Sequence, residues 1–270
     1  MKSRFIALLA VVFVLGQSVG LRAEDAVKPQ YTINIDAGHG NDSEGNRSRP
    51  YEETITHSFR GKTVTVQKGE TFKEHWANVG IAVELEKILT QCGFRVVKSG
   101  WNDDNALDDI GKPADGRPES VVRHETIRNA RADVSISIHN NAASRLGAQG
   151  LETFYWEGHE QSRLLAEHLQ SQLIALYGQV DRGVKSNVFF MTNNEKMGTK
   201  AACLVEYCFM TNWEETSLYF SNPEAWFNYA VATARGICNF LNVPYTGPKP
   251  TVQKSEPVIP EGRANFQPGQ

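Results

Sequence analysis

The sequence has little that would suit it to nucleic acid or to a structural metal knuckle. Its 28 basic residues are outnumbered by 31 acidic ones, and no basic stripe of the kind that binds nucleic acid is present. Its four cysteines form no CxxC pair, and the HExxH motif of zincin proteases is missing. What remains is a globular composition, in which 40% apolar residues and 13 Phe are enough to fill a core.

The one long apolar run lies at the N-terminus. Basic MKSR precedes FIALLAVVFVLGQSVG, which is too short and has the wrong flanks for a membrane span. We predict a signal peptide at residues 1–23 and a short linker at 24–30, with an uncleaved anchor as the alternative. Cleavage removes three basic residues and no acidic ones, so the net charge changes from −3 to −6. We expect an exported protein, in the periplasm or otherwise secreted to the cell envelope, with no membrane span after cleavage.

The rest of the chain alternates between strand and helix patterns up to about residue 242. Apolar runs and alternation predict strands at 31–35, 94–99, 133–141, 150–156 and 201–208, a short strand at NVFFMT and a small hairpin at GKTVTVQKG. Helical spacing predicts helices from residue 72 to about 92 and over 119–131, 160–178 and 223–241. This alternation predicts an α/β fold: a single domain with a mostly parallel central sheet and helices on both faces.

Three segments interrupt or follow this alternation. Residues 41–70 and 101–120 are long polar segments that leave from the ends of predicted strands. Six of the 11 Pro residues fall in 243–270, which predicts a disordered Pro-rich tail.

Two predicted strands end in a histidine. The strand at 31–35 continues through DAGHG to His39, and the strand at 134–138 continues to His139. Ligands of open α/β sheets bind beyond the carboxyl ends of the strands, so these two imidazoles could share a metal. Glu74, near the start of a predicted helix, would complete a His-Glu-His set with an open position, as in catalytic zinc sites. The alternatives are surface histidines and a helix N-terminal acid stabilised by the helix dipole.

Glu206 interrupts the apolar run AACLVEYCFM. A carboxylate buried there without a partner would be costly. Two interpretations stay open. Glu206 forms a salt bridge with an arginine such as Arg123, or it carries protons beside a metal-bound water.

Five segments occur in an order that resembles a known family. They are DAGHGN, FKEHWANVGIA, RHETIRNARADVSISIHNNA, GLETFYW and CLVEYCFMTN. Together they resemble the zinc-dependent N-acetylmuramoyl-L-alanine amidases of the amidase-3 type over about residues 31–241. The shared elements are Asp-x-Gly-His-Gly, a helix-start Glu followed by Asn four positions on, Ser-x-His-x-Asn and Val-Glu-x-x-Phe-x-x-Asn.

The resemblance implies a zinc amidase domain at residues 31–242. One Zn2+ per chain would be held by His39, Glu74 and His139, with Glu206 as the catalytic residue. The substrate would be peptidoglycan or muropeptides, cut between the lactyl carbonyl of N-acetylmuramic acid and L-alanine of the stem peptide. The segments at 41–70 and 101–120 are longer than is usual in this family, and these insertions would shape or cover the cleft. A protein activator is compatible with this interpretation, nucleic acid is not expected, and a monomer is the expected state.

Three further residues have weaker indications. Asp36 would orient His39 or form a turn, and Asn141 would position substrate or form a turn. Arg123 would take part in function or simply tie a helix to a loop. His75 is not expected to be a ligand, because neighbouring helix positions point about 100° apart. Two other functions also stay open: another exported zinc amidase or carboxypeptidase acting on cell-wall peptides, and a catalytically inactive peptidoglycan-binding regulator.

Overall fold

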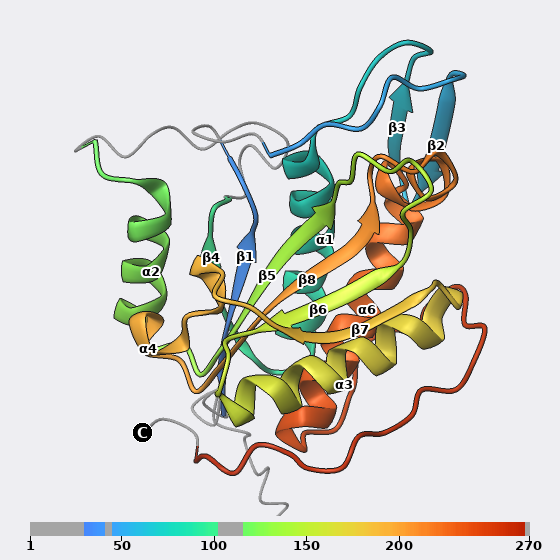
Figure 1. Ribbon diagram of the computed structural model, residues 1–270. Coiled ribbons are helices and arrows are strands. Elements are labelled where there is room, and N and C mark those ends of the chain that lie inside the picture. Colours follow the sequence, from blue (N-terminus) through green and yellow to red (C-terminus); the bar gives the residue numbers. More distant parts are fainter. Residues whose placement is uncertain (1–29, 41–44, 102–115, 268–270) are drawn as a thin grey trace, which may run out of the picture.

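Figure 1 shows the computed structural model of the chain, which describes residues 30–40, 45–101 and 116–267. The predicted signal peptide at 1–23, nearly all of the linker at 24–30 and most of the insertion at 101–120 lie outside these residues.

A six-stranded sheet forms the centre of the molecule, with the strand order β4-β1-β5-β8-β6-β7. The strands are β1 (Thr32–Ala37), β4 (Arg95–Ser99), β5 (Val134–Asn141), β6 (Leu151–Tyr155), β7 (Asp181–Ser186) and β8 (Ala201–Phe209). All neighbouring pairs are parallel except β6 and β8, which are antiparallel. This arrangement confirms the predicted α/β fold with a mostly parallel sheet. The middle strands are apolar or small-residue runs because both of their faces are buried.

Helices cover both faces of this sheet. On one side α1 (Glu74–Gln91) and α3 (Glu160–Tyr177) pack on the strands and on α6 (Pro223–Leu241), around the main core. On the other side α2 (Glu119–Asn129), η1 (Phe190–Thr192) and α4 (Asn194–Met197) enclose a smaller core that includes Met197 and Ala202. The short α5 (Trp213–Glu215) and η2 (Thr216–Phe220) connect β8 to α6. Among the described helices, none has the length and apolar character to cross a membrane.

Two local predictions were wrong. The segment NVFFMT is not a strand: it leads into η1, and the edge strand β7 precedes it in DRGVKS. Charged residues and a glycine at position 183 hide the alternation of that strand. The segment GKTVTVQKG supplies only β3 (Lys62–Val66), whose partner in an antiparallel hairpin is β2 (Ile55–Phe59).

The predicted disordered tail is instead packed on the domain. Figure 1 shows residues 243–267 running along the helical layer. Lys254 N donates to Ala175 O of α3 at 3.1 Å, and Ala264 N donates to Phe240 O of α6 at 2.9 Å. The Phe266 ring contacts Phe240, with ring centroids 6.0 Å apart. The prolines prevent regular structure, but an extended chain can still bind through its remaining N–H groups and one aromatic anchor.

Candidate active site

Polar side chains lie near the carboxyl ends of the middle strands, on the face of the sheet opposite the main core. On β5 and β8, core residues alternate with residues on the opposite face, and His139 pairs in register with Glu206. His39 follows β1, and α1 begins at Glu74. The carboxyl ends of the strands and the start of α1 therefore converge at one end of the sheet.

The structure brings the three predicted ligands together. Glu74 Oε1 lies 3.1 Å from His39 Nε2 and 3.2 Å from His139 Nδ1. Ligand atoms of all three residues lie within 4.8 Å of one another. Burial alone would raise the pKa of Glu74, but hydrogen bonds to His139 and His39 hold this pKa below its usual value. Two imidazole nitrogens and one ionised carboxylate form a donor set that fits a divalent metal such as zinc.

The DAGHG loop is held in an unusual backbone conformation. His39 has a φ of 66°, which is uncommon for a residue other than glycine. Gly38 lies so close to His139 that a Cβ atom would come within 2.3 Å of the imidazole ring. Gly38 O accepts hydrogen bonds from Asn78 Nδ2 and His75 Nδ1, both at 3.0 Å. His75 therefore supports the loop from α1 and, as expected, is not part of the ligand group.

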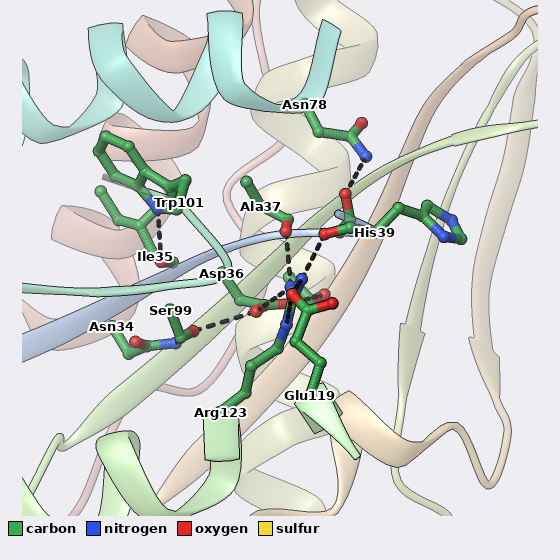
Figure 2. A network of polar contacts seen from close by, with 12 residues as sticks. Asn34, Ile35, Asp36, Ala37, His39, Asn78, Ser99, Trp101, Glu119 and Arg123 are labelled. Atoms are coloured by element: carbon green, nitrogen blue, oxygen red, sulfur yellow. Dashed lines mark hydrogen bonds and ion pairs between the residues drawn. The ribbon is translucent and has the colours of Figure 1, made fainter. Parts of the chain in front are cut away.

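Arg123 ties α2 to this loop, as Figure 2 shows. Its Nη1 donates to Asp36 Oδ1 at 2.8 Å and to Ala37 O at 2.6 Å, and its Nη2 donates to His39 O and Glu119. Burial would lower the pKa of the Arg123 guanidinium, but Asp36 and Glu119 raise it above its usual value. Arg123 is therefore a charged support for the backbone on either side of Gly38.

Asp36 is hydrogen-bonded to side chains of β4, β5 and α2. Its carboxylate accepts from Arg123, from Ser99 Oγ at 3.0 Å and from Ser137 Oγ at 2.5 Å. Arg123 bonds both the Asp36 carboxylate and His39 O, so it links Asp36 to the His39 backbone.

Among the described residues, the ion-pair partners of Arg123 are Asp36 and Glu119, so Arg123 is not the partner of Glu206. Its Oε2 is buried and has no hydrogen-bond partner among the residues that the structure describes. Burial, together with the charges of Glu74 and Glu152, raises the pKa of Glu206 well above its usual value. A carboxyl group with a raised pKa can exchange protons near neutral pH.

Asn141 is hydrogen-bonded to Glu152, an acidic residue that the sequence analysis did not identify as part of the site. Its Nδ2 donates to Glu152 Oε1 at 2.7 Å. Glu152 also accepts from Arg182 Nε at 2.8 Å and from Lys185 Nζ. The predicted strand GLETFYW includes Glu152. The sequence DRGVKS gave no sign that Arg182 and Lys185 would both donate to this carboxylate.

The start of the insertion at 41–70 reaches the site, and the hairpin does not. Asn46 N donates to Glu74 Oε2 at 3.0 Å, and Gly45 lies against both Glu74 and His39. The hairpin packs instead on α6, where the Phe59 and Phe227 rings lie 5.3 Å apart. Within its described residues, the insertion therefore supports the ligand group rather than covering the cleft.

Gly45→Ala should disturb the ligand group. A Cβ at this position would lie 2.6 Å from Glu74 Oε2 and 2.6 Å from His39 Cδ2, so a ligand side chain must move. We expect a 10- to 100-fold loss of metal affinity, the usual effect of displacing a supporting contact. Competition with a chromogenic chelator would measure this loss. Gly61→Ala is the matched control, since Gly61 also has a positive φ but has open space around it. Equal affinities of the two variants would contradict the prediction.

A cavity of about 320 Å³ opens beside the histidines. It is lined by Asp36, Gly38, His39, Pro118, Glu119, Ser120, Arg123, His139 and Met191. Residues 118–120 belong to the end of the predicted insertion at 101–120, so this part of the insertion does shape the site.

The remaining histidines lie apart from the ligand group. His57 Nε2 on β2 is 2.8 Å from Ser217 O. His159 caps α3, and its ring accepts from Ser162 N. His124 is buried and stacks on Phe190, with ring centroids 3.9 Å apart.

Comparisons with known proteins identify a family for the chain. The model of the Amidase_3 family, N-acetylmuramoyl-L-alanine amidase, matches residues 33–239. The N-acetylmuramoyl-L-alanine amidase LytC of Bacillus subtilis (strain 168) is 31% identical over 159 residues, which are 58% of this chain. The chain spans only 31% of the length of LytC.

Solved structures share the fold over most of the chain. An N-acetylmuramoyl-L-alanine amidase from Clostridium difficile 630 is 26% identical with a TM-score of 0.60, over 79% of this chain and 98% of that one. The catalytic domain of CwlV, from Bacillus (Paenibacillus) polymyxa var. colistinus, is 24% identical with a TM-score of 0.59. That match covers 79% of this chain and 99% of the CwlV domain, and it supports the fold.

Proposed function

The chain belongs to the N-acetylmuramoyl-L-alanine amidase family, and from this premise we propose that it is a zinc-dependent hydrolase of peptidoglycan. It would cleave the amide between the lactyl carbonyl of N-acetylmuramic acid and L-alanine of the stem peptide. The observation that carries this proposal is the grouping of His39, Glu74 and His139, with Glu206 on the strand next to His139.

The three grouped residues would hold one zinc ion. Two imidazoles and a carboxylate, with a fourth position open, are typical of catalytic rather than structural zinc. Zinc bound there would supply a Lewis acid that polarises the amide carbonyl and lowers the pKa of water to about 7.

Glu206 would move the proton that the reaction needs. It would accept a proton from the attacking water and deliver it to the nitrogen of the departing alanine. Its position on the strand beside His139 suits this double role, since the same group must take and then release a proton. Asn46, Asn140 and Arg123 would keep the ligands in place through Glu74 and the His39 backbone.

Digestion of purified peptidoglycan by the protein lacking residues 1–23 would test this function. We expect mass spectrometry to find intact stem peptides with a free N-terminal L-alanine. A chelator should abolish this release, and added zinc should restore it. Release of single amino acids, with shortened stems still attached to the glycan, would indicate the carboxypeptidase alternative. No release from a protein with one bound zinc per chain would favour the inactive regulator, unless a protein activator from an envelope extract restores it.

We also propose that the protein is exported and acts in the periplasm or elsewhere in the cell envelope. The composition of residues 1–23 supports this, as does the likeness to LytC. The mature protein isolated from its native cells should then begin at Glu24. An intact Met1 in soluble cell contents would contradict export.

A further inference from the structure

We propose that Arg182 and Lys185 bind a carboxylate of the peptide part of the substrate, an inference that rests on the proposed amidase function. These two cations extend the active site from Glu206 toward the edge strand β7.

The polar groups of the site form a row across one face of the sheet. His139 on β5 pairs in register with Glu206 on β8, and Glu206 pairs with Glu152 on β6. Residues paired in register on neighbouring strands project to the same face of a sheet. The row therefore runs from a predicted metal ligand through the proposed proton carrier to Glu152.

A β-bulge brings both cations to this face. Leu151 pairs with Asp181 and Thr153 with Val184, so β7 contains one extra residue between these pairs. In a regular strand, positions 182 and 185 would face opposite sides of the sheet. With the bulge at Gly183, where φ is 80°, Arg182 Nε lies 2.8 Å from Glu152 and Lys185 Nζ also pairs with Glu152. Bulges often re-aim side chains beside active sites.

The two cations are only half neutralised by their shared acid. Burial would raise the pKa of Glu152, but hydrogen bonds from Lys185 and Arg182 hold this pKa below its usual value. The group therefore carries one negative and two positive charges. The Arg182 and Lys185 side chains are 34% and 39% exposed, so an anion from solution can reach them. Arg182 also lies 4.8 Å above the Phe209 ring, which limits its motion.

The position of Glu206 indicates which part of the substrate reaches these cations. The proton carrier must lie beside the departing nitrogen, so the peptide leaves on the Glu206 side of the ligand group. Two strand spacings, about 10 Å, separate β8 from β7. An extended peptide covers about 3.4 Å per residue, so the cations would meet the first three residues of the stem. The cations thus fit a carboxylate-bearing stem residue, whereas the neighbouring glycan sugars offer no matching charge.

The test compares two synthetic N-acetylmuramoyl tripeptides, one with free carboxylates and one with each carboxylate converted to an amide. We expect the wild-type protein to hydrolyse the acidic substrate with a kcat/KM about tenfold higher. Lys185→Met should reduce this ratio to near one, mainly through the KM of the acidic substrate. Lys185→Arg should retain most of the ratio. Lys87→Met, which removes an exposed lysine of α1, should leave both rates unchanged.

The outcomes separate this inference from the function on which it rests. Equal hydrolysis of both substrates by the wild-type protein would overturn the carboxylate site and leave the amidase function intact. A Lys185→Met variant that keeps the full preference for the acidic substrate would also overturn the carboxylate site and leave the amidase function intact. Hydrolysis of neither substrate would count against the amidase function, and the carboxylate site would then be decided by binding alone. Calorimetric titration with the free tripeptide gives a second readout, because its affinity should fall about tenfold in Lys185→Met without any need for turnover.

Discussion

Glu206→Gln should lower the rate of amide hydrolysis by about 10²- to 10⁴-fold, the usual contribution of a positioned acid or base. Glutamine keeps the size of the side chain but cannot accept and return a proton. Because Glu206 Oε2 has no hydrogen-bond partner among the described residues, the substitution breaks no hydrogen bond of this buried oxygen. We therefore expect the melting temperature and the metal content to stay the same.

Release of stem peptides, followed by mass spectrometry, would measure the rate of this variant. Metal content per chain would be measured on the same samples. Glu214→Gln is the matched control, since Glu214 is exposed on the neighbouring α5. A Glu206→Gln rate within tenfold of the wild-type rate would show that another group moves the proton.

Arg123→Met should reduce the free energy of unfolding by about 3–5 kcal/mol. Arg123 and Asp36 are both buried, and methionine would leave the Asp36 carboxylate without its cationic partner. The same substitution removes the donors to Ala37 O and His39 O, so metal affinity should also fall. Urea denaturation would measure the stability change, provided that m stays constant.

Two further variants test the cause of this loss. Arg117→Met removes an exposed guanidinium from an ion pair with Glu125, where both side chains are more than 40% exposed. This change should alter stability by less than about 1 kcal/mol. Adding Asp36→Asn to Arg123→Met should recover part of the loss, because the unpaired charge is then removed as well. A loss below about 1 kcal/mol for Arg123→Met alone would mean that the buried pair is not important for stability.

The central part of the site could be predicted because simple rules place it. His39 and His139 follow parallel strands, and the carboxyl ends of such strands meet at one edge of a sheet. Glu206 was conspicuous as a charge in an apolar strand. These inferences needed only strand direction and the cost of burying a charge.

The supporting contacts could not be predicted, because they depend on pairing register and on long-range contacts. The bulge at Gly183 changes which side chains of β7 share a face, and a strict two-residue alternation fails there. Arg123 was expected to be either a partner of Glu206 or a tie between helix and loop. The choice depended on Asp36, which is 87 residues away in the sequence. The tail was misjudged because proline content reports the lack of regular structure and not the lack of contacts.

The docked tail also brings the two ends of the domain together. Phe266 contacts Tyr31, just before β1, with ring centroids 6.2 Å apart. Tyr31 stands at the amino end of its strand, while His39 follows the carboxyl end, so both ends of the domain lie on the side away from the site (Figure 1). A tether at either end, whether an uncleaved anchor or a fused module, would therefore point the catalytic face outward. A domain attached in this way could bind a polymeric substrate in front of it without first rotating about its attachment point.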